Sequence, residues 1–265
     1  MTNKSETKNS HWDGNEYNQI SSPQYQINQK FLNNYLFSGN EYVLDIGCGS
    51  SQTTRDISIK VPNGKVFGID ASESMIFSAN KLNKQQNLTF QTMDAQKIEF
   101  INQFDLVTCF FCMQWVKDKL MTFEKIYYAL RTQGKFLMIA PLPHPDLPRI
   151  RLELIQKPFW KKYFTHYSDP LIYINDFFYK SYAEKAGFIV KSYYEEEQPI
   201  VFSNYTEFFN FMKQMTPHIS QLPNEEKKNE FMHELLEKYL AVNKLLIDGS
   251  CKLIFKLAKM VASKK

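Results

Sequence analysis

The chain has little of what marks secreted or membrane-spanning proteins. Its four cysteines are few and irregularly spaced over 265 residues, which is typical of reduced thiols and not of a disulfide framework. No segment offers about eighteen uncharged apolar residues for a membrane span, and residues 1–19 contain no apolar stretch that could form the core of a signal peptide. We therefore expect a cytoplasmic protein without a membrane span.

A pervasive positive charge is also missing. The formal net charge is +4, but the last fifteen residues, CKLIFKLAKMVASKK, carry five lysines and no acid, so the rest of the chain holds 27 basic and 28 acidic residues. A protein that binds long nucleic acid needs a broad basic face. We expect no nucleic-acid partner.

Two of the cysteines have the spacing C-x-x-C, but their surroundings argue against a redox or zinc pair. Cys109 and Cys112 lie within FDLVTCFFCMQW, an apolar run that predicts a buried strand. Residues three apart on a strand point to opposite faces of the sheet. We therefore expect two structural thiols and no bound metal.

What is present is an alternation of strand-like and helix-like segments. Five apolar runs predict strands, at 42–46, 65–69, 88–92, 104–111 and 134–140, and helical spacing predicts helices at 24–37, 53–59, 74–83 and 120–130. Such alternation indicates a parallel sheet covered by helices on both faces. Ligands of such sheets bind beyond the carboxyl ends of the strands.

The alternation breaks after Pro141. Five prolines between Pro141 and Pro158 indicate an insertion and not a crossover helix. Sheet character returns at 189–193, and helices are expected at 205–215 and 225–240.

The basic C-terminal stretch allows two interpretations. The break at Gly249 and Ser250 and the need of the fold for a late strand favour a strand at 251–258. The alternative is a helix on a membrane surface, because Lys252, Lys256 and Lys259 share helical spacing.

The stretch VLDIGCGSS, residues 43–51, places an aspartate two residues before a glycine pair at the end of the first expected strand. Glycines at such a point let a ligand approach the backbone. A dinucleotide loop would read G-x-G-x-x-G, but Gln52 stands at the third glycine. Asp45 would repel a pyrophosphate and attract a cofactor that carries an ammonium and a sulfonium, such as S-adenosylmethionine. Asp70, at the end of the next strand, can accept hydrogen bonds from both hydroxyls of its ribose.

Five segments in order resemble the successive motifs of the class I S-adenosylmethionine-dependent methyltransferases: VLDIGCGSS, VFGIDASESM, MDAQKI, FDLVTCFFCMQWV and LRTQGKFLMIAP, which together cover residues 43–141. The resemblance implies a doubly wound, mostly parallel, seven-stranded Rossmann-like α/β sheet with an α-helical lid insertion. It also implies S-adenosylhomocysteine as the product and no metal. One departure is Ser51, which stands where the family commonly has a third glycine.

The same resemblance implies the cofactor residues. Asp45, Gly47 and Gly49 would hold the methionine end, and Asp70 the ribose. The other expected cofactor contacts are Tyr17, Ala71, Met75, Asp94, Ala95 and Phe110. The alternative for a strand-terminal aspartate such as Asp94 is that it caps the next element.

Within the family, FFCMQWVKD is similar to a segment of the trans-aconitate and juvenile hormone acid methyltransferases that ends in a Q-W or H-W pair. Tyr17 and Gln24, seven apart, look like a Tyr and a Gln ahead of the first strand in the juvenile hormone acid type. The resemblance implies that Gln24 and Gln114 donate to a substrate oxygen and that Trp115 walls the acceptor pocket. The alternative places Trp115 in the core and Gln114 at a solvated strand end.

The insertion would then lie over a small-molecule acceptor. Residues 149–162 hold five basic residues and one acid, Glu153, which suits an anionic acceptor, although an exposed basic helix face explains the same pattern. A carboxylic acid with a pKa of about 4 is ionised at neutral pH, so its methylation needs no general base. An amine or hydroxyl acceptor needs a base, for which His144, His166 and several tyrosines are candidates.

Together these observations divide the chain into four expected parts. They are an N-terminal helical segment over the cofactor site (1–40), the cofactor-binding α/β core (41–141), the lid insertion (142–182), and a C-terminal part that completes the sheet with inserted helices (183–265). The expected function is methylation of a small-molecule carboxylate to a methyl ester, by proximity alone. The alternatives are an N-, C- or protein methyltransferase of the same fold, or a cofactor-binding protein without catalysis.

Overall fold

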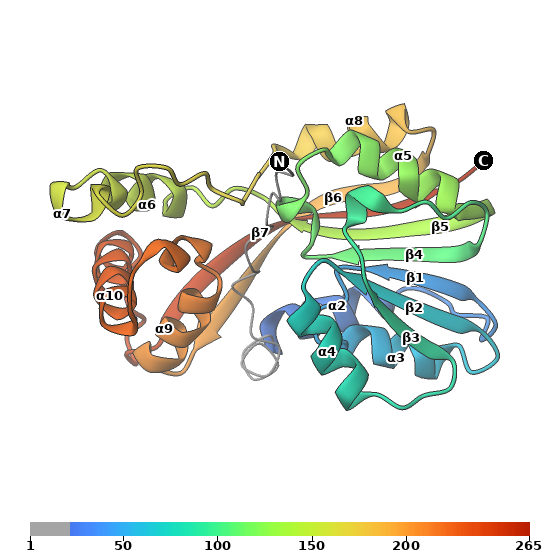
Figure 1. Ribbon diagram of the computed structural model, residues 1–265, viewed down its shortest axis with the longest axis horizontal. Coiled ribbons are helices and arrows are strands. Elements are labelled where there is room, and N and C mark those ends of the chain that lie inside the picture. Colours follow the sequence, from blue (N-terminus) through green and yellow to red (C-terminus); the bar gives the residue numbers. More distant parts are fainter. Residues whose placement is uncertain (1–21) are drawn as a thin grey trace, which may run out of the picture.

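The computed structural model describes residues 22–265, in which a seven-stranded sheet lies between two layers of helices (Figure 1). The strand order is β3-β2-β1-β4-β5-β7-β6, with β1 to β5 parallel and β7 antiparallel to both of its neighbours. The strands are β1 (Tyr42–Ile46), β2 (Lys65–Asp70), β3 (Leu88–Thr92), β4 (Phe104–Phe110), β5 (Leu130–Pro141), β6 (Ile189–Phe202) and β7 (Cys251–Ser263). This is the doubly wound α/β sheet that the sequence predicts.

Helices cover both faces of the sheet. One face carries α2 (Ser22–Leu32), α3 (Gln52–Lys60) and α4 (Glu73–Leu82), and the other carries α5 (Lys119–Ala129) and α8 (Asp176–Lys185) (Figure 1). Successive residues of β1 serve the two layers, because Val43 packs with α2 and α3 whereas Leu44 packs toward α5 and α8. Burial on both faces explains why the strand is a continuous apolar run.

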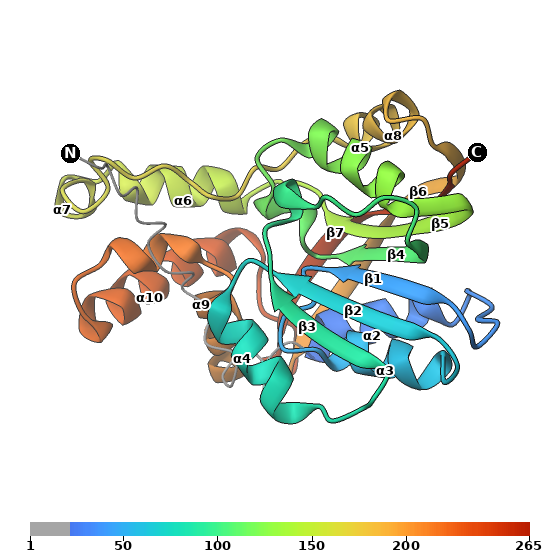
Figure 2. The same ribbon diagram turned by 45° about the vertical axis from the view of Figure 1, so that its right-hand side comes forward.

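The remaining helices form a separate layer beyond the end of the sheet, here called the helical cluster (Figures 1 and 2). It contains α6 (Leu147–Ile155), α7 (Pro158–Lys161), α9 (Tyr205–Gln214) and α10 (Glu225–Val242), with the 3-10 turn η3 (Pro217–Gln221). Its own buried core joins Leu154 and Trp160 of the first two helices to Phe211 and Phe231 of the last two, and includes Ile200 and Leu253 from the outer ends of β6 and β7.

The predicted insertion 142–182 therefore differs from what the structure shows. Helix α8, most of which it included, packs on α5 and β6, and its Tyr179 and Ala183 lie in the core of the sheet. The helices α9 and α10, which come from a later segment of the chain, pack with α6 instead. The helical cluster is built from two stretches of chain because neither buries its apolar face alone.

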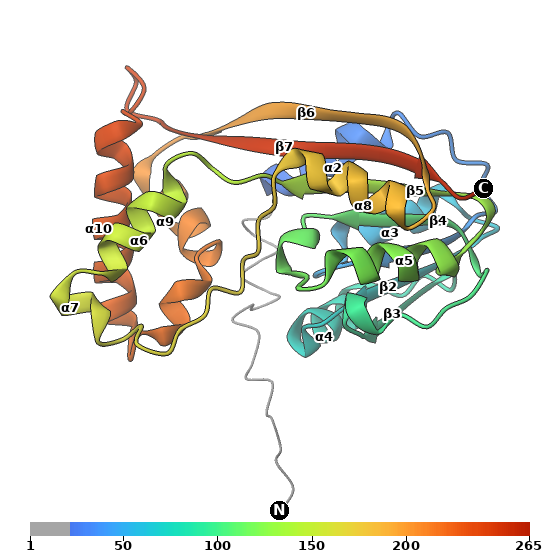
Figure 3. The same ribbon diagram turned by 90° about the horizontal axis from the view of Figure 1, so that it is seen from above.

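The C-terminal stretch forms a strand, as the favoured interpretation predicts, but strands β6 and β7 are longer than expected. They pair from Ile189 opposite Ser263 to Phe202 opposite Cys251, which carries the sheet into the helical cluster (Figure 3). Lys259, which the surface helix would expose, is buried and forms an ion pair with Glu196. A helix along this segment is excluded.

Candidate functional site

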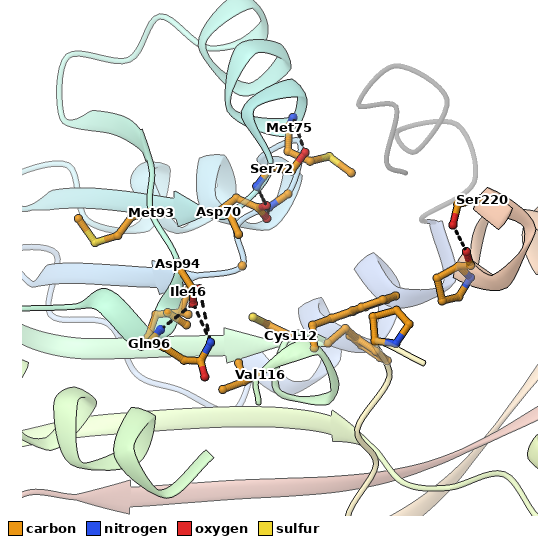
Figure 4. Close-up of a pocket in the computed structure, with 18 of the residues that line it drawn as sticks. Ile46, Asp70, Ser72, Met75, Met93, Asp94, Gln96, Cys112, Val116 and Ser220 are labelled. Carbon is orange, nitrogen blue, oxygen red and sulfur yellow. Dashed lines mark hydrogen bonds between the residues drawn. The ribbon is translucent and has the colours of Figure 1, made fainter. Parts of the chain in front are cut away.

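The main cavity, of about 570 Å³, lies at the carboxyl ends of the parallel strands (Figure 4). β1 lies between β2 and β4, so the chain reverses its direction of winding here, and such a crevice is where open α/β sheets bind ligands. Nine of the predicted site residues line it: Gly47, Gly49, Asp70, Ala71, Met75, Asp94, Ala95, Phe110 and Trp115. Tyr17 lies outside the described residues.

At Gly47, the loop after β1 lies too close to the turn that follows β4 for a side chain to fit. A Cβ on Gly47 would lie 2.5 Å from the Cβ of Cys112, and Gly47 and Gly49 both have positive φ, 72° and 52°. Ser51, at the position of the missing third glycine, also has a positive φ of 90°. A non-glycine residue is strained in this region, so the departure from the family pattern has an energetic cost.

Asp70 organises the loop and faces the main cavity. Its Oδ2 accepts a hydrogen bond from the Gly49 N–H at 3.0 Å, and its Oδ1 accepts one from the Ser72 N–H at 2.8 Å. Burial raises the pKa of Asp70, and the two backbone donors work in the opposite direction. A carboxylate has about four acceptor positions, so capacity remains for the hydroxyls of a bound ribose.

Asp45 lies on the other side of the loop, beside a smaller cavity of about 60 Å³. Its two oxygens accept hydrogen bonds from Thr54 of α3 at 2.6 Å and from Thr108 of β4 at 2.7 Å. Burial raises the pKa of Asp45 to about 6, and the nearby charge of Asp70 adds to the effect. A buried carboxylate without a cation in contact is costly, and a bound ammonium group would relieve that cost.

Gln24 lies beside this smaller cavity and does not line the main one, in contrast to its predicted role at the acceptor. Its Nε2 lies 3.5 Å from the Met215 sulfur, and its buried Oε1 has no hydrogen-bond partner among residues 22–265. Asn28, one helical turn later on α2, has a buried Oδ1 that likewise lacks a partner within this part of the chain. Two unpartnered acceptors next to Asp45 suit a cationic ligand.

Asp94 caps the next element and also lines the main cavity. Its Oδ1 accepts a hydrogen bond from the Gln96 N–H at 2.8 Å and so caps the short turn η1 (Ala95–Lys97). The same residue lines the main cavity beside Met93 and Gln96. Gln96 holds the arrangement in place, since its Oε1 accepts from the Asp118 N–H at 2.9 Å.

The two residues of the Q-W pair after β4 lie in different surroundings. Trp115 lines the main cavity as expected. Gln114 is buried and does not line it: its Nε2 donates to the Phe111 carbonyl at 2.7 Å, and its backbone carbonyl accepts from the Ile172 N–H at 2.8 Å. Gln114 thus anchors the segment that follows α7, and the structure does not place it in contact with an acceptor.

The two cysteines of the C-x-x-C lie side by side, contrary to expectation. β4 ends at Phe110, and the positive φ of Phe111, 51°, turns the chain so that Cys112 returns toward Cys109. The hydrogen bond between the two thiols, together with burial, raises the pKa of Cys109 well above its ordinary value. Such thiols are poor nucleophiles, which agrees with the predicted structural role.

The wall opposite the strand ends comes from the helical cluster and the segment after α7. Its lining residues are His166, Tyr167, Ser168, Pro170, Pro217, Ser220 and Gln221. Ser220 lies across the cavity from Asp70 and Met75 (Figure 4). Only His166 of these was a predicted candidate, and the others lie outside the family motifs, so the sequence carried no signal for them.

The basic stretch 149–162 does not supply charge to this cavity. Arg149 pairs with Asp146 and Glu153, Arg151 with Asp169, and Lys157 with Glu234. Among the described residues that line the cavity there is no lysine or arginine. His144, the other candidate base, lines a different cavity, where its Nδ1 accepts from the Asp146 and Leu147 N–H groups.

These residues fit S-adenosylmethionine. Gly47 and Gly49 bring the backbone to the cavities, Asp45 with the Gln24 and Asn28 oxygens that have no partner among residues 22–265 suits the cationic methionine end, and Asp70 suits the ribose. Apolar side chains of Met75, Ala95 and Phe110 line the part of the main cavity that an adenine would occupy. Over residues 22–265, no three His, Cys, Asp or Glu side chains are grouped as a metal site would need. The described helices include none with the length and apolarity to cross a bilayer.

Comparisons with known proteins agree with this geometry. Residues 43–134 match the family model described as a methyltransferase domain. The chain is 31% identical over 230 residues to "Putative methyltransferase 235L" of Invertebrate iridescent virus 6, a match that covers 87% of this chain and 86% of that protein. It is 26% identical over 129 residues to juvenile hormone acid O-methyltransferase of Bombyx mori, covering 47% of this chain and 46% of that one.

The fold also resembles that of solved methyltransferase structures. The "putative methyltransferase" of Bacillus halodurans C-125 superposes with a TM-score of 0.63 at 16% identity, over 90% of this chain and 99% of that one. The five ordered motifs, the site at the carboxyl ends of the strands and the full-length viral relative lead to one conclusion. This chain belongs to the class I S-adenosylmethionine-dependent methyltransferases.

Proposed function

We propose that the protein methylates a carboxylate of a small molecule to a methyl ester, without a general base. The observation that carries the proposal is the cavity of about 570 Å³, in which the candidate cofactor residues face a wall without a lysine or arginine among residues 22–265. The match to juvenile hormone acid O-methyltransferase, itself a carboxyl methyltransferase by name, supports the same chemistry. We place the reaction in the cytoplasm, where the four free thiols would remain reduced.

The bound cofactor would supply an electrophilic methyl group on a sulfonium. At one end of the site, Asp45, Gln24 and Asn28 would hold the ammonium of its methionine part, and Asp70 its ribose. Tyr17, which lies outside the described residues, and Gly49, Ala71 and Asp94 complete the proposed cofactor contacts. These groups fix where the methyl group points, which is the main requirement of a transfer that depends on proximity.

At the other end, neutral donors would orient the acceptor. Gln221 offers an amide with a second N–H beyond the one that it donates to the Ser220 hydroxyl at 3.3 Å, and Trp115 lines the same cavity. The Ser220 hydroxyl donates to the Pro217 carbonyl at 2.8 Å and would have to turn to reach an acceptor. A lysine or arginine here would repel the sulfonium and reduce the nucleophilicity of a carboxylate, whereas neutral donors orient it at lower cost. A methyl ester formed from a carboxylate carries no proton that has to be removed, so the transfer needs no general base.

A second candidate function rests on His166. It is the one histidine lining the main cavity among residues 22–265, and so it is placed where a base for an amine or hydroxyl acceptor would be needed. The two candidates differ in how the rate depends on pH.

Single-turnover rates of methyl transfer, measured from about pH 6 to 8.5, distinguish them. The acceptor is first found by mass spectrometry, from a panel of carboxylic acids, fatty acids and amines incubated with methyl-labelled cofactor. With a carboxylate acceptor the rate should be nearly flat over this range, because the nucleophile stays ionised. His166→Asn should then change the rate less than about threefold, as should the matched control His233→Asn on the exposed face of α10.

A rate that rises about tenfold per pH unit, and that collapses in His166→Asn alone, would replace the carboxylate by an amine or hydroxyl acceptor. Trp115→Ala should lower the rate in either case, since it widens the site and loosens the approach. Cofactor that stays bound without any S-adenosylhomocysteine being formed, with every acceptor in the panel, would instead indicate a binding protein.

A further inference from the structure

The end of α10 and the turn from it to β7 carry a group of exposed aliphatic side chains, here called the aliphatic tip: Val242, Leu245, Leu246 and Ile247. Their exposed fractions are 55%, 48%, 39% and 110%. The tip projects beyond the helical cluster, away from the sheet (Figure 3). Chain turns are usually built from Gly, Pro, Asn, Asp and Ser, so three consecutive aliphatic residues in this turn are unusual.

The turn is held in one shape and does not fold its apolar residues inward. The Gly249 N–H donates to the Leu246 carbonyl at 2.9 Å, and the Leu246 N–H donates to the Ser250 carbonyl at 2.9 Å. Asp248 accepts from the backbone and the hydroxyl of Ser250, at 3.0 and 2.6 Å. These bonds place Ile247 at the apex, fully exposed to solvent. A contiguous exposed apolar group of this kind indicates a surface that binds a partner or a membrane.

Lysines surround the base of the tip. Between residues 238 and 256 the chain carries four lysines and a single acid, Asp248. Three of them, Lys244, Lys252 and Lys256, line a cavity of about 520 Å³ together with Ile254 and Tyr239. Glu197 also lines this cavity, and Lys256 pairs with Glu195 at 2.5 Å. Within residues 22–265, Lys244 and Lys252 have no carboxylate partner.

We propose that this end of the molecule docks on an anionic lipid surface. The aliphatic tip would enter the headgroup region while Lys244 and Lys252 contact lipid phosphates. This is the arrangement of an interfacial anchor, in which apolar insertion and electrostatic attraction act together. A second copy of the chain fits less well, because a symmetric contact through the tip would place the lysines of one copy against those of the other. The proposal is independent of the methyl acceptor.

Flotation with lipid vesicles tests the proposal on the full-length protein. Vesicles of phosphatidylcholine with about a third of phosphatidylserine are compared with vesicles of phosphatidylcholine alone. The protein should bind the anionic vesicles and release them at high salt. Ile247→Ser should weaken binding by about tenfold, as expected from losing the burial of one large aliphatic side chain. Lys244→Gln and Lys252→Gln should each weaken it by about fivefold.

Matched controls lie on other faces of the molecule. Ile101→Ser removes an aliphatic side chain that is 68% exposed, and Lys84→Gln removes an exposed lysine, so both should bind vesicles as the parent does. All variants should keep the parent melting temperature and affinity for S-adenosylhomocysteine. Equal binding to neutral and anionic vesicles, no binding to either, or unchanged binding by Ile247→Ser would each overturn the proposal. So would a dimer in solution that Ile247→Ser dissociates, since a second copy would then cover the tip.

Discussion

At the scale of single residues, the cofactor site is built from groups that are unfavourable in the ligand-free protein. Asp45 is a buried carboxylate whose pKa burial raises to about 6, and Ser51 adopts a backbone conformation suited to glycine. Gln24 and Asn28 bury oxygens that have no partner in the part of the chain that the structure describes. A bound cofactor would pair with the Asp45 carboxylate and with the Gln24 and Asn28 oxygens. Part of the stability of the protein is therefore expected to depend on its ligand.

Asp45→Asn should stabilise the ligand-free protein at pH 7.5 and weaken cofactor binding. The pKa of Asp45 is about 6 in the folded state against 3.8 in a free chain, so its ionisation costs the fold about 3 kcal/mol at neutral pH. The cost is absent below about pH 4, where Asp45 is protonated in both states. It grows as the pH rises toward 6 and is complete above that value, so the free energy of unfolding falls over this range. Thermal melts from pH 4 to 8 should show that the gain from Asp45→Asn disappears at low pH, and calorimetry should show at least tenfold weaker binding of S-adenosylhomocysteine. Unchanged affinity would remove Asp45 from the cofactor site.

Ser51 offers a test of backbone strain with its own control. Ser51→Ala loses the hydrogen bond that the Ser51 hydroxyl accepts from Asn83 at 2.5 Å and keeps the positive φ, whereas Ser51→Gly loses the bond and relieves the strain. The glycine variant should therefore be more stable than the alanine variant by about 1 kcal/mol, or about 2 °C in melting temperature. Equal melting temperatures would mean that the loop carries no strain at this residue.

At the scale of elements, the cavity wall opposite the strand ends depends on how the segment after α7 is tied to the helices around it. Asp169 accepts hydrogen bonds from Arg151 of α6 at 3.2 Å, from His218 of η3 at 3.0 Å and from the Leu171 N–H at 2.9 Å. Burial lowers the pKa of His218, so the neutral ring donates through Nε2. One carboxylate thus joins both stretches of chain that line the wall.

Asp169→Asn should cost about 1 to 2 kcal/mol of stability, because Arg151 and His218 lose their shared partner while remaining largely buried. Burial alone would raise the pKa of Asp169, but the bond from His218 and the charge of Arg151 outweigh it and lower the pKa. The stabilisation is therefore present at neutral pH and lost as the pH falls through that lowered pKa. Denaturant melts should show the two proteins converging below about pH 4.

The control for this change lies on α6, the helix that carries Arg151. Arg149 and Glu153 form an exposed ion pair at 2.9 Å, each side chain being 53% exposed, so Glu153→Gln should cost less than about 0.5 kcal/mol. A loss in Glu153→Gln equal to that in Asp169→Asn would mean that the network around Asp169 does not hold the wall together.

At the scale of the whole molecule, two bodies share one cavity. The sheet with its two layers of helices supplies the cofactor residues, and the helical cluster, reached through the long strands β6 and β7, supplies the opposite wall (Figures 1 and 4). A ligand that contacts both walls is therefore expected to stabilise segments far apart in the sequence.

Hydrogen exchange measures this coupling directly. S-adenosylhomocysteine should slow exchange at residues 47–51 and 70–75, where the loops at the strand ends bind it. It should also slow exchange at 166–170 and 217–221, because these segments line the same cavity. The turn at 243–250 serves as the internal control and should not change. Protection confined to the strand ends would show that the helical cluster does not close over the cofactor.

Much of the core could be predicted from the sequence because its signals are local. β1 and β3 begin and end at the predicted residues, and in β1 four of the five residues are buried, as expected of a parallel strand covered on both faces. Asp45, Gly47, Gly49 and Asp70 were found because strand ends, glycines and carboxylates follow one another within a few residues. Their position at one edge of the sheet then follows from the parallel alternation alone.

What only the tertiary structure decided depends on contacts between distant segments. The helical cluster joins residues 147–161 to residues 205–242, and no local pattern says which insertion packs on which. The basic stretch 149–162 pairs with carboxylates such as Asp169 and Glu234 and does not line the main cavity, and Gln24 lies beside Asp45 at the smaller cavity instead of the main one. Cys109 and Cys112 meet because the strand ends one residue earlier than its apolar run. A sequence specifies which faces must be buried, but the partner that buries each face is chosen by the packing of the whole chain.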